Sequence, residues 1–82
     1  MKHYKTIKVK EKEFWWRVYG YNGGRKLEII FTPEKFPEYE GVTHDLSFWN
    51  YPPSEIIGMV KTDCVAYLNG EWEEWMPTIE GK

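Results

Sequence analysis

The residue types that could bind a metal ion or attack a substrate are few and far apart in this sequence. The candidates are His3, His44 and Cys64, and none of them stands in the short paired spacing that zinc sites use. Nucleophilic catalysis would need Cys64 to lie beside His44. The apolar residues around Cys64 predict instead a buried and unreactive thiol. We therefore expect no metal site, no cofactor and no enzymatic activity.

Two other catalytic patterns are incomplete. Glu71, Glu73 and Glu74 could supply paired carboxylates, but an acidic edge strand is usually only solvated. The pair Gly23-Gly24 is not followed by the start of a helix, so it does not match a phosphate-binding loop.

The most informative pattern lies between residues 14 and 31, where apolar and polar residues alternate on both sides of Asn22-Gly23-Gly24. Asparagine and glycine supply the positive φ angles that tight hairpin turns require. A two-residue loop at Asn22-Gly23 predicts the pairs Val18–Leu27, Trp16–Ile29 and Phe14–Phe31 on one face, and Arg17–Glu28 and Trp15–Ile30 on the other. A turn at Gly23-Gly24 would shift the partners by two but would keep the faces, because side chains alternate with a period of two.

The second face of this hairpin is the first candidate binding site. It carries aromatic residues interleaved with cations, namely Trp15, Arg17, Tyr19 and Tyr21, with Lys26 nearby. Rings and cations together suit single-stranded nucleic acid, because rings stack on bases and cations meet phosphates. The same residue types are enriched in the hot spots of protein interfaces. The structural alternative is that Trp15 packs under another element and Arg17 only pairs with Glu28.

A second candidate site combines aromatic and acidic residues near the C-terminus. Its members are Trp72, Glu73 and Trp75. In a regular strand the two tryptophans face opposite ways, so one of them could be exposed beside carboxylates and meet a basic protein surface. The structural alternative is that both tryptophans belong to the core of an acidic edge strand.

The remaining elements complete a mainly β fold, a single domain over residues 1–82 with four to six antiparallel strands. Residues 5–10 and 42–49 alternate between apolar and polar types, which predicts two further strands. Residues 32–41 predict an ordered loop pinned by Phe36 and Tyr39.

The C-terminal third of the chain is harder to assign. Ser54 could cap a short helix that ends near residue 60, although Gly58 weakens this assignment and a strand is almost as well supported. Residues 64–68 and 71–75 predict a second hairpin, with its turn at Asn69-Gly70.

Composition limits the class of protein. The 82 residues carry a net charge of −2 and are 18% aromatic, so a few large side chains can anchor one small core. Residues 1–26 carry eight Lys and Arg against two Glu, whereas residues 27–82 carry three Lys against eleven Asp and Glu. Such a split predicts either separate partner faces or halves that pair in the fold. The sequence shows no signal peptide and no apolar run long enough for a bilayer, so we expect a cytoplasmic protein.

These features favour a small non-enzymatic module that binds another protein. Its general character resembles that of the small accessory proteins of bacterial and archaeal viruses, which would make it a regulator or inhibitor of a host protein, although no family motif is present. The alternative is a domain that binds single-stranded nucleic acid, against which the acidic net charge counts. Neither function requires a membrane or a small-molecule cofactor, and a homodimer is compatible with both.

Overall fold

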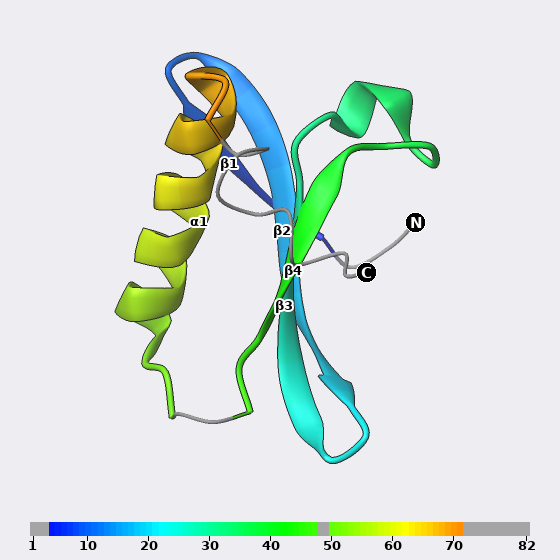
Figure 1. Cartoon of the computed structure of the whole chain (residues 1–82), viewed down its shortest axis with the longest axis vertical. Coiled ribbons are helices and arrows are strands. Elements are labelled where there is room, and N and C mark those ends of the chain that lie inside the picture. The colour runs from blue at the N-terminus through cyan, green and yellow to red at the C-terminus, as the bar shows by residue number, and fades with distance from the viewer. Residues whose placement is uncertain (1–3, 48–49, 72–82) are drawn as a thin grey trace.

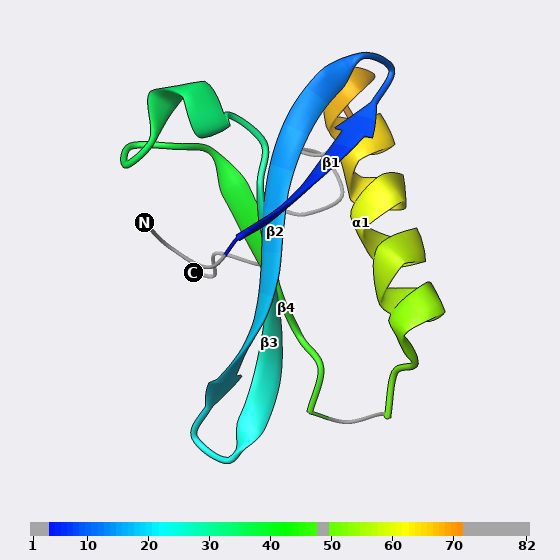
Figure 2. The same cartoon turned by 180° about the vertical axis from the view of Figure 1, so that it is seen from behind.

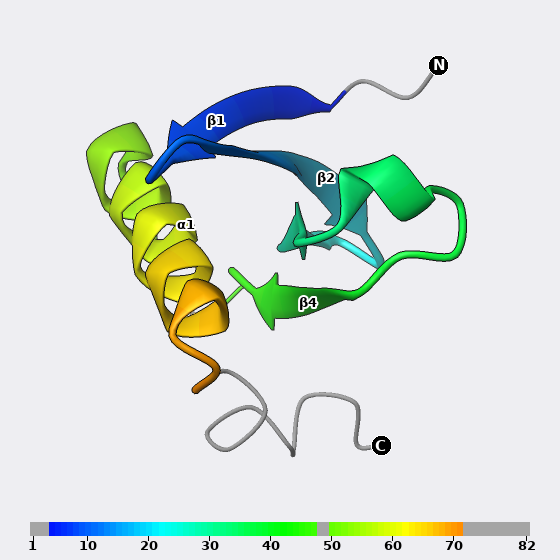
Figure 3. The same cartoon turned by 90° about the horizontal axis from the view of Figure 1, so that it is seen from above.

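Four antiparallel strands and one long helix make up residues 4–47 and 50–71, which are the residues that the computed structural model describes. The strands are β1 (Lys5–Val9), β2 (Lys12–Tyr21), β3 (Gly24–Ile30) and β4 (Gly41–Asp45), and they lie in this order across the sheet. A one-turn 3-10 helix, η1 (Pro33–Lys35), follows β3, and α1 (Pro53–Leu68) follows β4. The helix covers one face of the sheet and the η1 segment lies over the other (Figures 1 and 3). The predicted mainly β fold with four to six antiparallel strands is confirmed.

The β2–β3 hairpin has the predicted turn and register. Asn22 and Gly23 adopt φ angles of 52° and 81°, which is the left-handed geometry of a tight two-residue turn. The observed pairs include Val18–Leu27, Trp16–Ile29, Arg17–Glu28 and Trp15–Ile30. The ladder ends at Trp15–Ile30, so Phe14 and Phe31 are not a ladder pair. Their rings still meet edge to face, with centroids 6.3 Å apart.

A second tight turn joins β1 to β2, and β1 is an edge strand of the sheet. This turn consists of Lys10 and Glu11, whose φ angles of 52° and 68° are unusual for residues with a Cβ. The β1–β2 register pairs Ile7 with Phe14 and places Ile7 against the core.

The core lies between the sheet and α1. The sheet contributes inward side chains from β2, β3 and β4, and the helix contributes side chains that recur every three or four residues. The members of the core are Phe14, Trp16, Leu27, Ile29, Phe31, Val42, Leu46, Ile56, Val60 and Cys64. Burial of a continuous stripe on the helix and of one sheet face is the standard two-layer solution for a small domain.

The C-terminal part corrects two predictions. The helix expected over residues 54–60 is present but continues to Leu68, so residues 64–68 are not a strand. Pro52 rather than Ser54 occupies the N-cap position, and no side chain caps this end. Ile56, Val60 and Cys64 lie four residues apart and are all buried, which is the period of a helix and not of a strand.

The pair Asn69-Gly70, expected to be a hairpin turn, ends this helix. Gly70 has a φ of 76°, its N–H bonds to the carbonyl of Tyr67 at 3.0 Å, and the N–H of Glu71 bonds to the carbonyl of Ala66 at 2.8 Å. These are the two hydrogen bonds of a Schellman cap. The expected second arm, residues 71–75, lies outside the described residues except for Glu71.

β4 is shorter than the strand predicted over residues 42–49. It ends at Asp45, and the Oδ1 atom of Asp45 then accepts a hydrogen bond from the N–H of Ser47 at 2.9 Å. A carboxylate that binds the backbone two residues ahead stabilises a turn in competition with the strand ladder.

Candidate functional site

The sheet face opposite α1, here called the outer face, gathers aromatic side chains around one ion pair. β2 supplies Trp15, Arg17 and Tyr19, and β3 supplies Glu28. Three more rings come from Tyr4, just before β1, and from Phe36 and Tyr39, in the segment after η1. We call these seven residues the outer aromatic cluster.

Glu28 is the centre of this cluster and accepts three hydrogen bonds. Its Oε1 accepts from Arg17 Nε at 2.8 Å and from the Tyr4 hydroxyl at 3.0 Å, and its Oε2 accepts from the Tyr39 hydroxyl at 2.6 Å. Burial by itself raises the pKa of Glu28, but these hydrogen bonds and the charge of Arg17 outweigh it, so the pKa lies below its ordinary value. The same hydrogen bond and burial raise the pKa of Tyr39 strongly. Glu28 is therefore an ionised anchor for three side chains.

The guanidinium of Arg17 is held between two rings. Its Cζ atom lies 5.0 Å from the ring centroid of Tyr4 and 4.5 Å from that of Tyr19. Both distances are within the range of cation–π attraction. With the hydrogen bond to Glu28, these contacts fix a side chain that would otherwise sample many rotamers.

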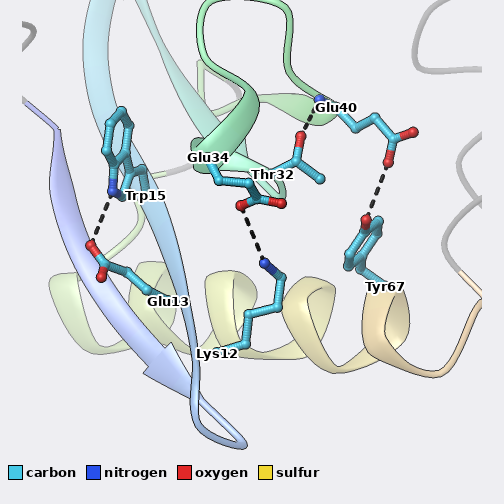
Figure 4. A network of polar contacts seen from close by, with 7 residues as sticks. All are labelled: Lys12, Glu13, Trp15, Thr32, Glu34, Glu40 and Tyr67. Carbon is cyan, nitrogen blue, oxygen red and sulfur yellow. Dashed lines mark hydrogen bonds and ion pairs between the residues drawn. The ribbon is translucent and has the colours of Figure 1, made fainter.

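Trp15 lies at the other end of the outer aromatic cluster. Its ring lies 5.7 Å from the ring of Tyr4 and 5.6 Å from that of Phe36, and its Nε1 donates a hydrogen bond to Glu13 at 3.2 Å (Figure 4). Phe36 also stacks on Tyr39, with ring centroids 5.4 Å apart. Phe36 is 36% exposed, and Trp15 is half-buried. The cluster therefore presents ring surface to solvent while most of its members hold one another in place.

Contacts on both sides hold the segment that carries Phe36 and Tyr39 (Figure 4). Across its base, the N–H of Glu40 donates to Thr32 Oγ1 at 2.8 Å, and the N–H of Phe31 donates to the carbonyl of Glu40 at 2.7 Å. The hydroxyl of Tyr67, from α1, donates to Glu40 Oε1 at 3.2 Å. A 3.5 Å ion pair between Lys12 and Glu34 ties η1 to the start of β2. The predicted ordered loop pinned by its aromatic residues is thus present.

The predicted residues of the first candidate site fall into two groups. Trp15, Arg17 and Tyr19 come together and are partly exposed. Lys26 lies on the same face, paired with Tyr19 on one side and with Asp45 on the other. The backbone of Tyr21 pairs with Gly24, but its side chain is outside the described part of the chain. The structural alternative was that Trp15 packs under another element and that Arg17 pairs with Glu28. Both contacts are present, because Phe36 and Tyr4 cover part of Trp15 and Arg17 pairs with Glu28.

Other predicted site residues are not placed. Trp72, Glu73 and Trp75 lie outside the described residues, so the second candidate site remains a prediction. Conversely, the hairpin pattern did not assign Tyr4, Phe36 or Tyr39 to the first site. The sequence did contain one signal for these additional residues. Glu28 is a carboxylate predicted on the same face as Arg17, and it can accept further hydrogen bonds from other side chains.

The residues with catalytic side chains do not form a nucleophilic dyad. His44, on β4, pairs with Asp63 of α1 and not with Cys64. Burial, aided by the charge of Asp63, raises the pKa of Cys64 to about 12, and this thiol is fully buried. Among residues 4–47 and 50–71, no three His, Cys, Asp or Glu side chains are grouped so that they could hold a metal ion.

The chain matches no model of a protein family, no curated protein and no solved structure. Within the described residues, no helix has the length and apolar character needed to cross a membrane.

Proposed function

We propose that this protein is a small non-enzymatic module that binds another protein through the outer aromatic cluster. The observation that carries the proposal is the position of Arg17 between Tyr4 and Tyr19, with its guanidinium hydrogen-bonded to Glu28. Arginine and aromatic side chains dominate the binding energy of protein interfaces. Those that are already ordered lose less conformational entropy when a partner binds.

The chemistry of the cluster also suggests the kind of partner surface. The exposed atoms of Trp15 and Phe36 offer ring faces and edges, and Glu28 has its carboxylate oxygens occupied by internal hydrogen bonds. A partner that places an apolar side chain on these rings would bury area without leaving Glu28 unpaired. A small regulator or inhibitor of a larger protein, of the kind that viruses direct at host proteins in the cytoplasm, fits a domain with one such surface.

Site-specific crosslinking tests this function. A photoreactive phenylalanine analogue replaces Phe36 in one variant and Lys61 in a control, because Lys61 is exposed on α1, away from the outer face. After illumination in the source cells, we expect one protein crosslinked from position 36 and not from position 61. Trp15→Ala should weaken binding of that protein about 30-fold, the effect of a hot-spot residue worth about 2 kcal/mol. Equal crosslinking from both positions, or unchanged affinity of Trp15→Ala, would refute the proposal.

Single-stranded nucleic acid is a less well supported ligand of the same face. Arg17 already forms an ion pair with Glu28, so its positive charge is partly neutralised within the fold and attracts a phosphate less strongly than an unpaired arginine would. Titration with single-stranded DNA and RNA oligonucleotides at increasing salt separates the two functions. We expect no binding at low salt, whereas binding with a steep salt dependence would favour the nucleic-acid alternative.

A further inference from the structure

β1 is shorter than the strand it pairs with, and among the described residues it leaves part of the sheet edge without a partner strand. The ladder between β1 and β2 ends where Lys5 pairs with Trp16. β2 continues beyond this pair to Tyr21, so β1 runs alongside only one half of it (Figure 2). In the described part of the chain, no strand pairs with residues 17–21 on the side away from β3.

The two-residue turn at Asn22-Gly23 determines which backbone groups face this open edge. In such a hairpin the residues that flank the turn exchange hydrogen bonds, and every second pair does so thereafter. From the observed register, the N–H and C=O groups of Val18 and Gly20 therefore point away from β3. These groups bond to no backbone group of residues 4–47 and 50–71 on that side. Unpaired strand groups of this kind are a template for an added strand.

A groove lies along the same edge, between β2 and the first turns of α1. Trp16 and Val18 line it from the sheet, and Tyr51, Ile56 and Ile57 line it from the helix side. Its volume of about 620 Å³ is in the range of sites that hold drug-sized ligands. Because Val18 contributes its side chain to the groove and its backbone to the edge, a strand added beside β2 would place every second side chain in the groove.

The charges around the groove are all of one sign. Lys5, Arg17 and Arg25 line it; Arg17 pairs with Glu28, whereas the side chains of Lys5 and Arg25 form no ion pair with the residues that the structure describes. Among residues 4–47 and 50–71, no Asp or Glu lines the groove. The N-terminus of α1, at Pro53, also lies here and adds the positive end of the helix dipole. An occupant with carboxylates at its ends and an apolar centre complements this arrangement.

We infer that the open edge of β2 and this groove bind an extended acidic segment of a partner protein by strand addition. Backbone hydrogen bonds to Val18 and Gly20 supply affinity, and the groove selects the alternate side chains, as in other proteins that bind peptides at a sheet edge. The groove lies on the helix side of the sheet, and Arg17 is the one member of the outer aromatic cluster among its lining residues. Strand addition uses the backbone of Val18 and Gly20 and the charges of Lys5 and Arg25, so its test is separate from the test of the function proposed for that cluster.

The test uses the full-length ¹⁵N-labelled protein and two synthetic peptides. The first is acetyl-Ser-Glu-Val-Trp-Val-Glu-Ser-amide, in which tryptophan and both glutamates share one face of a strand. The second has lysine in place of each glutamate. We expect the glutamate peptide at millimolar concentration to shift the amide resonances of Val18 and Gly20 in a saturable manner, and the lysine peptide not to do so. Shifts confined to the outer aromatic cluster, or equal binding of both peptides, would overturn the inference.

Three variants separate the contributions of charge and backbone. Lys5→Glu/Arg25→Glu should weaken the glutamate peptide about tenfold or more, since attraction at two positions becomes repulsion. Lys61→Glu, a charge reversal outside the groove, should leave its affinity unchanged. Gly20→Pro removes an N–H that is not used in the ladder with β3, and it should abolish binding. If Gly20→Pro fails to fold, the charge variants still decide, and equal affinities of the Lys5→Glu/Arg25→Glu and Lys61→Glu variants would refute the inference.

Discussion

The Nε2 atom of His44 lies 2.5 Å from Oδ2 of Asp63, a contact that ties β4 to α1 across the edge of the core. The Asp63 side chain is only 5% exposed, so its carboxylate depends on this partner. His44→Ala should therefore lower the free energy of unfolding by about 3 kcal/mol, the usual cost of leaving a buried charge unpaired. Urea denaturation at neutral pH measures this loss.

A double variant distinguishes the pair from the packing around it. In His44→Leu/Asp63→Leu both polar groups are replaced by apolar ones, so no buried charge remains. We expect this variant to be clearly more stable than His44→Ala. Lys61→Gln, an exposed change in the middle of the same helix, serves as a control with little expected loss. A His44→Ala variant as stable as this control would show that the pair contributes nothing.

The β2–β3 hairpin could be predicted from sequence because its signals are local. Asn22-Gly23 specifies the turn, and a period of two on both arms then determines which side chains pair. The pair Arg17–Glu28 followed directly from this register. Local chemistry and the tertiary fold agree here, so a short window of sequence was sufficient.

The C-terminal segment was misassigned because the same local signals fit two structures. Asn69-Gly70 supplies a positive φ angle, which both a hairpin turn and a helix end require. A run of apolar residues from 64 to 68 fits a buried strand or the last turns of a buried helix equally well. The choice between strand and helix is decided by the packing of Ile56, Val60 and Cys64, spaced four residues apart, against the sheet. This packing is a tertiary contact and is not visible in a short window of sequence.

The candidate site was predictable only for the part that lies on the hairpin. Tyr4, Phe36 and Tyr39 reach Glu28 from segments before β1 and after η1. Their positions depend on how those segments cross the outer face. No periodic pattern encodes that path, because irregular segments lack a fixed relation between sequence spacing and direction.

The pH dependence of stability should report the network around Glu28. The folded state holds the pKa of Glu28 below its ordinary value of 4.5, so the ionised contact stabilises the fold above that pH. This stability is lost as the pH falls through the lowered pKa. We expect Glu28→Gln to cost about 2 kcal/mol at pH 7, the worth of hydrogen bonds to a charged group, and clearly less at pH 3.

Urea denaturation of wild type and Glu28→Gln at both pH values provides the comparison. Glu38→Gln removes an exposed carboxylate with no side-chain hydrogen bond among the described residues, so its difference from wild type should be small at either pH. A Glu28→Gln deficit that is the same at pH 7 and at pH 3 would contradict the account.

Replacement by alanine should have opposite effects on stability at two glycines of this protein. A Cβ at Gly41 would lie 2.4 Å from the backbone oxygen of Ile29, so Gly41→Ala must push β3 and β4 apart. We expect a loss of about 2 kcal/mol, typical of overpacking. Gly58 lies in α1 with nothing within 4 Å of its Cβ position, so Gly58→Ala should stabilise by about 1 kcal/mol through helix propensity. Thermal denaturation of both variants tests the pair, and a more stable Gly41→Ala would contradict the strand contact.

The β1–β2 turn could be stabilised by giving it the residue types that the β2–β3 turn already has. Lys10 and Glu11 adopt positive φ angles, as Asn22 and Gly23 do, but their side chains make this conformation costly by about 1 kcal/mol or more for each residue. Lys10→Asn/Glu11→Gly gives this turn the residue types of the second one. Because glycine also loses more entropy on folding, we expect a net gain of about 1 kcal/mol in the free energy of unfolding.

Lys10→Asn/Glu11→Ala removes the same charges without the conformational freedom of glycine, so it should gain less. Equal stability of these two double variants, measured by urea denaturation, would show that the φ angle of Glu11 imposes no cost.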